Sequence, residues 1–131
     1  MIRMGIVRHG IDMVDCNRIG QMVERYGMRF LKRVFTPREI EYCKSRRRFI
    51  EHLAGRFAAK EAVLKVLGTG WRNGIQWTDI EIVNEPSGKP RIILTGKCLE
   101  IAQAENLGEI LISISHISTH AIASAIASRS D

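Results

Sequence analysis

The segment from Phe49 to Leu67 constrains the fold more than any other part of this sequence. On a helical wheel, at about 100° per residue, large apolar side chains such as Leu53 and Leu64 share one side. Small and branched apolar residues cover nearly the opposite side: Gly55, Ala59, Ala62, Val63 and Val66. A helix that is apolar on both sides is largely buried. The sequence therefore predicts a long central helix, ended by Gly68-Thr69-Gly70.

Two narrow polar strips interrupt the apolar surface of this helix. Arg56 and Lys60 form one strip, and Glu61 and Lys65 form the other, each pair at i,i+4 spacing. Charged side chains on a buried helix are costly to desolvate unless they meet one another, a metal or phosphate groups. Two interpretations stay open on the wheel alone. The strips form a functional site, or Glu61–Lys65 is an ordinary helical ion pair while Arg56 and Lys60 reach water.

The flanking segments predict the rest of a mixed domain. A strand is expected over residues 6–12, followed by a helix that Asp15 caps and Gly27 ends. The start signal at Thr36-Pro37-Arg38-Glu39 is stronger, because it combines a capping box with proline at the first helical position. Alternation and turn formers predict the remaining elements: a hairpin with strands near 80–82 and 91–94, a short helix over 96–106 that Gly108 ends, and closing strands near 110–115 and 121–127.

This order of elements indicates an α+β fold rather than a repeated βαβ pattern. We expect a small, mostly antiparallel sheet packed against the long buried helix and shorter helices. At 131 residues, of which 45% are hydrophobic, the chain matches one domain over residues 1–131. Three cysteines, odd in number and far apart, do not suit a disulfide framework or a zinc site, so we expect them to be small buried hydrophobes: Cys16, Cys43 and Cys98.

The chain shows no segment typical of export or of membranes. The charge at Arg8 comes too early for the apolar core of a signal peptide, and no apolar run reaches about 18 residues. We therefore expect a cytoplasmic protein without membrane association. Its net charge of +6 favours an acidic partner, which could be nucleic acid, a protein surface or a phosphorylated small molecule.

Seven short motifs follow one another along the chain. They are Gly10-Ile11-Asp12, Phe35-Thr36-Pro37-Arg38-Glu39, Gly55-Arg56-Phe57-Ala58-Ala59-Lys60-Glu61-Ala62 with Lys65, Gly68-Thr69-Gly70, Asp79-Ile80-Glu81-Ile82, Gly88-Lys89-Pro90 and Ser113-Ile114-Ser115-His116. In this order they resemble the holo-acyl-carrier-protein synthases, the short single-domain type of phosphopantetheinyl transferase. The eight-residue helix motif is the most specific of them. Ile117-Ser118 matches no strong family pattern.

The resemblance implies a fold, a reaction and a metal. The fold would be that of the phosphopantetheinyl transferases. Phosphopantetheine would move from coenzyme A to a serine of an acidic apo acyl carrier protein, releasing adenosine 3′,5′-bisphosphate, in fatty acid biosynthesis. Asp12 and Glu61 would bind Mg²⁺, which suits hard oxygen ligands. Lys65 would stabilise the bridging or leaving phosphate, and Glu61 or a metal-bound water would accept the serine proton.

The resemblance also implies binding positions and an assembly. Arg56, Lys60 and His116 would contact the phosphates of coenzyme A, and the backbone of two glycine-containing segments would line the nucleotide: Gly68, Thr69 and Gly70, and Gly88, Lys89 and Pro90. Arg18 would receive the carrier protein, with Arg25 and Arg29 as helpers, although a solvated basic face is the favoured interpretation of Arg25 and Arg29. A homotrimer with active sites between subunits would follow. Alternating alanines on the last strand would permit close packing there: Ala121, Ala123, Ala125 and Ala127.

Rival functions have weaker support in the sequence. A nucleic-acid-binding module could use basic residues outside the motifs, but the eight aromatic residues form no strand-borne stacking pattern. A transferase serving polyketide or peptide synthases is a second alternative, which the short chain disfavours. His116 and His120 lack the glutamate of a zinc-protease motif, and Ser115 lacks the glycines of a nucleophile elbow. The basic residues of the first rival are Arg29, Lys32, Arg33 and Arg46-Arg47-Arg48.

Overall fold

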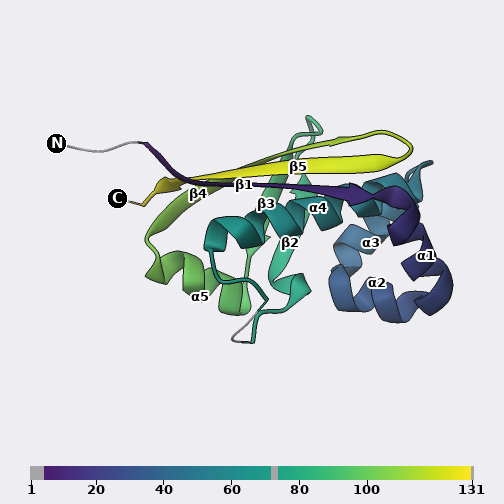
Figure 1. Ribbon diagram of the computed structural model, residues 1–131, viewed down its shortest axis with the longest axis horizontal. Coiled ribbons are helices and arrows are strands. Elements are labelled where there is room, and N and C mark those ends of the chain that lie inside the picture. The colour runs from purple at the N-terminus through teal and green to yellow at the C-terminus, as the bar shows by residue number, and fades with distance from the viewer. Residues whose placement is uncertain (1–4, 72–73, 131) are drawn as a thin grey trace.

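The computed structural model describes residues 5–71 and 74–130, and it confirms the expected α+β fold (Figure 1). The chain opens with a long strand, folds three short helices, and then forms the long helix, a hairpin, a last helix and two long strands. The elements are β1 (Ile6–Asp15), α1 (Cys16–Tyr26), α2 (Met28–Val34), α3 (Pro37–Lys44), α4 (Phe49–Leu67), the 3₁₀ turn η1 (Trp77–Asp79), β2 (Ile80–Asn84), β3 (Pro90–Leu94), α5 (Gly96–Ala104), β4 (Leu107–His116) and β5 (His120–Arg129).

Helix α4 is the centre of the molecule, as the sequence predicts. It lies along the antiparallel sheet β1-β5-β4, while β2 and β3 form a separate hairpin (Figure 1). Thirteen of its side chains are buried, so its apolar surface is covered on more than one side. It ends at Gly68, whose φ of 81° is the left-handed cap that glycine adopts without strain.

The alanines of β5 face inward, so the close packing that they permit is with α4 of the same chain. Ala121, Ala123, Ala125 and Ala127 are at most 1% exposed. Since β5 contacts α4, these small side chains let the helix approach the sheet closely. The opposite face of the sheet carries the exposed apolar residues: Ile11, Met13, Leu111 and Ile122.

The predicted helix starts are confirmed, one short helix was not predicted, and the end of one helix is corrected. Asp15 accepts a hydrogen bond from the Asn17 N–H at 2.8 Å, and Thr36 forms the complete capping box with Glu39. The short helix α2 was missed, because Gly27 reads as a stop and seven residues give little periodicity. Helix α5 ends at Ala104 rather than at the predicted residue 106, because Asn106 turns the chain at a φ of 55°.

All three cysteines are buried and free, as expected. No helix within residues 5–71 and 74–130 has both the length and the apolar content that crossing a membrane requires.

Candidate active site

Asp12 and Glu61 lie at one cavity of about 460 Å³. Alternation along β1 turns Asp12 toward α4, because its neighbours Ile11 and Met13 are exposed on the other face. Glu61 projects from α4 on the facing side. The other residues that line the cavity are Met13, Val14, Asp15, Arg18, Phe57 and His120. Two carboxylates that are 49 positions apart in the chain therefore share one opening.

The close approach of β1 to α4 depends on Gly10. A Cβ atom at this position would collide with the Ala62 carbonyl oxygen and would lie 3.0 Å from the Lys65 Cβ. Gly10 is buried and stands two residues before Asp12, on the same face of the strand. The glycine thus sets the distance at which the Asp12 carboxylate meets the helix. Gly55 has a similar place against β4, where a Cβ would lie 2.9 Å from Ile114 Cγ2.

The charges in this cavity favour a bound cation. Burial raises the pKa of Glu61 above its ordinary value, and the negative charge of Asp12 raises it further. Trp71, Lys65 and Arg18 act in the opposite direction. A raised pKa means that the ionised carboxylate is destabilised where it lies. A positive charge between Asp12 and Glu61 would relieve this.

Lys65 supplies part of that positive charge. Its Nζ donates to the Ile11 carbonyl oxygen at 2.6 Å and lies 3.2 Å from Asp12 Oδ1. The structure therefore pairs Lys65 across elements with Asp12. Among the described residues there is no ion pair between Glu61 and Lys65, so the ordinary helical pair that the wheel left open does not form. The Lys65 side chain is 53% exposed and remains accessible to a ligand.

The donor set fits magnesium. In the described part of the chain, no three His, Cys, Asp or Glu side chains gather as a metal cluster. Magnesium does not need one, because it commonly takes one or two carboxylates and completes its octahedron with water and substrate phosphates. Asp12 and Glu61 are hard oxygen donors at an open cavity. His116 and His120, considered for zinc from the sequence, line different cavities.

A second cavity, of about 200 Å³, gathers four of the positions expected to contact coenzyme A. These are Arg56, Gly88, Pro90 and His116. The Arg56 Nη2 donates to Asn84 Oδ1 at 2.6 Å, and the guanidinium lies over the Tyr42 ring at 4.2 Å. The remaining residues of the wall were not expected to contact coenzyme A: Tyr42, His52, Gly55, Asn84 and Ile114.

Lys60 is corrected by the structure. Its side chain is fully buried, and its ammonium has three acceptors: Glu39 Oε1 at 2.8 Å, the Trp77 carbonyl oxygen at 3.1 Å and the Ile80 carbonyl oxygen at 2.5 Å. An ammonium has three donors, so none is left for a phosphate. Burial lowers the pKa of Lys60, although Glu39 acts to raise it. Lys60 joins α4 to α3 and the hairpin, and the expectation that it contacts coenzyme A is wrong.

Of the other expected positions, Arg18 lines the first cavity and the rest line neither cavity. Gly68-Thr69-Gly70 follows the end of α4, where the Thr69 hydroxyl donates to the Gly70 carbonyl oxygen at 3.2 Å. Lys89 is exposed between the two loop residues that line the second cavity. Arg18 lines the carboxylate cavity, whereas Arg25 lies exposed near the end of α1. For Gly68, Thr69, Gly70 and Lys89 a nucleotide contact stays a prediction.

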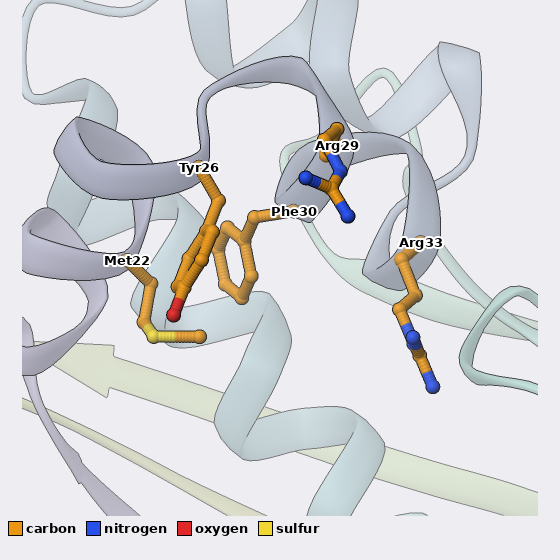
Figure 2. A pocket seen from close by; sticks show the side chains of 5 residues that line it. All are labelled: Met22, Tyr26, Arg29, Phe30 and Arg33. Atoms are coloured by element: carbon orange, nitrogen blue, oxygen red, sulfur yellow. The ribbon is translucent and has the colours of Figure 1, made fainter.

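A third cavity, of about 350 Å³, lies between α1 and α2 (Figure 2). Figure 2 shows the Tyr26 and Phe30 rings side by side, with Met22 next to them and Arg29 and Arg33 on the α2 side. An apolar floor with basic side chains at its edge suits an acidic protein segment that also carries apolar residues.

Comparison with known proteins finds one matching family model and many proteins of similar sequence. A family model described as the 4′-phosphopantetheinyl transferase superfamily matches residues 8–123. The holo-[acyl-carrier-protein] synthase of Koribacter versatilis (strain Ellin345) is 45% identical over 121 residues, which cover 92% of this chain and 97% of that protein. The synthase of the same name from Geotalea daltonii is 47% identical over 114 residues, or 87% of this chain and 91% of that one.

Solved structures with a similar fold are also acyl-carrier-protein synthases. The Helicobacter pylori holo-[acyl-carrier-protein] synthase in complex with coenzyme A has a TM-score of 0.80 and 36% identity, covering 91% of this chain and 98% of its own. The Plasmodium yoelii acyl carrier protein synthase with ADP bound has a TM-score of 0.86 and 32% identity, covering 99% of this chain and 100% of its own.

Proposed function

The chain belongs to the 4′-phosphopantetheinyl transferase superfamily, and from that membership we propose how its residues carry out the holo-acyl-carrier-protein synthase reaction. The chain transfers phosphopantetheine from coenzyme A to apo acyl carrier protein. The observation that carries the mechanism is the meeting of Asp12 and Glu61 at one cavity. We treat residues 1–131 as one transferase domain, and its cytoplasmic location stays a prediction.

Asp12 and Glu61 would hold Mg²⁺ in the cavity that they share. When bound, the ion would polarise the pyrophosphate of coenzyme A and neutralise charge on its oxygens. The fit rests on two hard carboxylate donors whose mutual repulsion contributes to the raised pKa of Glu61. Each carboxylate is positioned by a rigid element, β1 or α4.

The protein side chains then serve the displacement at phosphorus. The serine oxygen of the carrier forms a bond to the β-phosphorus, and the bond to the oxygen of adenosine 3′,5′-bisphosphate breaks. Glu61 is the protein group placed to accept the serine proton, since its carboxylate lies at the same cavity. Lys65, anchored by the Ile11 carbonyl oxygen, stabilises negative charge on the leaving phosphate.

Coenzyme A would be held in part at the second cavity. Arg56 and His116 supply the groups for its phosphates, and Gly88 and Pro90 supply a backbone edge. Coenzyme A as the substrate is supported by the relative from Helicobacter pylori, which was solved with it.

The carrier protein would dock on α1 and α2. Arg18 lines the carboxylate cavity itself. Arg25 is exposed to solvent near the end of the same helix, α1. The apolar cavity with Arg29 and Arg33 at its edge continues this surface (Figure 2). The net charge of +6 favours an acidic carrier by long-range attraction.

A homotrimer with active sites between subunits remains our proposal for the assembly. The surface that supports it is the outer face of the β1-β5-β4 sheet. Ile11, Met13 and Ile122 are 49%, 65% and 39% exposed there, which is unusual for neighbouring apolar side chains. Light scattering after size exclusion would test the trimer, and a monomer at micromolar concentration would refute it.

One assay tests the proposed function. The chain is incubated with coenzyme A, Mg²⁺ and apo acyl carrier protein, and the carrier is examined by mass spectrometry for covalent phosphopantetheine. We expect addition that requires Mg²⁺ and is lost in Glu61→Gln, with Glu100→Gln as the exposed control. No addition, together with salt-sensitive binding of nucleic acid, would favour the nucleic-acid-binding alternative.

A further inference from the structure

Glu51 and His116 form a close pair at the second cavity. The His116 Nδ1 lies 2.8 Å from Glu51 Oε1, across 65 positions of the chain. Glu51 is 9% exposed in the first turn of α4, and His116 is the last residue of β4. A carboxylate can only accept a hydrogen bond, so Nδ1 carries the proton in this pair. Nε2 is then the ring nitrogen that remains for a ligand, and when it is protonated as well it can donate to an oxygen atom.

The His116 ring is also held by a neighbouring aromatic side chain. His52 packs edge-on against it, with ring centroids 5.0 Å apart, and Tyr42 packs in the same way against His52 at 5.9 Å. Burial lowers the pKa of His52, and the charges of His116 and Arg56 lower it further. His52 therefore packs against the His116 ring as an uncharged side chain.

Arg56 provides independent evidence that this cavity takes an anion. Among the residues that the structure describes, its Nε is the sole buried side-chain nitrogen or oxygen without a hydrogen-bond partner. The residue is 4% exposed and lines the same cavity as His116. A buried N–H without an acceptor is unfavourable, so an oxygen-rich ligand in the cavity would satisfy it.

A glutamate beside such a cavity needs an explanation, because a free carboxylate would repel an anion. Glu51 is not free. It bonds to His116, and Arg48 Nη1 lies 3.8 Å from its second oxygen. The Arg48 guanidinium lies near one oxygen of the Glu51 carboxylate, and the His116 ring lies next to the other. The contact with Nδ1 sets the orientation of the His116 ring.

We propose that Glu51 is a positioning residue that holds the His116 ring so that a protonated Nε2, in the cavity that Arg56 also lines, donates to a phosphate oxygen of coenzyme A. This inference rests on the proposed function, since coenzyme A is the ligand. Glu51 touches neither the substrate nor the reacting atoms in this role. It acts through His116.

The first test compares Glu51→Gln with the exposed control Glu100→Gln. Both changes remove one negative charge and keep the side-chain size, but only the first alters the partner of Nδ1. We expect Glu51→Gln to raise the dissociation constant for coenzyme A, measured by calorimetry, and its KM about tenfold, as for the loss of a charge-assisted hydrogen bond. The KM for the carrier protein should stay unchanged. Equal affinity of Glu51→Gln and wild type for coenzyme A would overturn the proposal.

The second test asks whether Glu51 works through His116. In the His116→Ala background, Glu51→Gln should cost no further affinity for coenzyme A. A loss that persists there would show an independent structural effect and would overturn the positioning role.

The third test does not depend on coenzyme A. Long-range ¹⁵N–¹H spectra of the histidine rings, assigned with His116→Ala, should show His116 Nδ1 protonated in wild type, whatever the state of Nε2, and the Nδ1 signal should shift in Glu51→Gln. An unchanged ring spectrum would overturn the proposal. A wild-type chain that binds no coenzyme A would instead overturn the proposed function and the phosphate assignment, and the spectra would still decide whether Glu51 holds His116.

Discussion

Replacing Lys60 by methionine separates a structural lysine from a phosphate-binding one. The Lys60 ammonium has no exposed surface and bonds to the Glu39 carboxylate, which is 1% exposed. Removing one member of a buried ion pair costs about 3–5 kcal/mol, because the other charge stays buried without its partner. Glu39 keeps backbone N–H donors from Thr36 and Ile82, so we expect the lower end of that range.

Urea denaturation followed by circular dichroism measures this loss. With an m-value of about 1–2 kcal/mol/M for a small domain, a loss of about 3 kcal/mol lowers the midpoint by roughly 1.5–3 M. A small domain is stable by only about 5–15 kcal/mol, so Lys60→Met should be measured at low temperature. The double variant Lys60→Met with Glu39→Gln should recover only part of the loss, because the buried charge is removed but the glutamine NH2 then faces one of the two backbone donors, Thr36 N–H or Ile82 N–H.

Lys65→Met is the matched control on the same helix. The Lys65 side chain is 53% exposed, and an exposed ion pair contributes about 0–1 kcal/mol, so stability should change little. Transfer activity should fall, because Lys65 lies at the carboxylate cavity. The reasoning would be refuted if Lys60→Met kept the wild-type midpoint while its affinity for coenzyme A fell tenfold.

Three further predictions concern the carboxylate cavity and the carrier. Without metal, Glu61→Gln should unfold at a higher urea concentration than wild type at pH 7, because the raised pKa makes ionised Glu61 destabilising; the difference should vanish below the ordinary pKa of 4.5, and a lower midpoint at pH 7 would contradict this. Gly10→Ala should cost about 1–3 kcal/mol and reduce kcat/KM, because its Cβ meets the Ala62 carbonyl. The control Gly20→Ala has no neighbour nearer than 3.8 Å and should be tolerated, and equal effects would count against the close approach at Gly10. Arg18→Glu should raise the KM for the carrier far more than that for coenzyme A, and equal increases would remove Arg18 from the docking surface.

Most of the fold could be predicted because its signals are local. The bounds of α4 follow from apolar residues on both sides of one helix and from Gly68 at its end. The capping box at Thr36 needs only four consecutive residues. Helix α2 escaped prediction because its buried side chains Phe30, Leu31 and Val34 span too few turns to show a period. The end of α5 was misplaced because asparagine takes the left-handed turn less often than glycine does.

The candidate site was predicted less evenly. Asp12 and Glu61 were assigned from motif resemblance and do share a cavity. Glu51 was missed, since a glutamate in a first helical turn gives no sign of a histidine 65 positions later. Trp71 was missed too, although it opposes the rise in the pKa of Glu61.

By itself, the sequence determined where most of the helices and strands lie and which residues share a side of each, because these depend on spacing along one chain. Only the tertiary structure decided what each side meets. Arg56 and Lys60 lie on one strip of α4, yet Arg56 reaches a cavity and Lys60 enters the interior against Glu39. The alanines of β5 face α4 rather than another chain, for the same reason. Periodicity defines a face, but its partner depends on how distant segments pack.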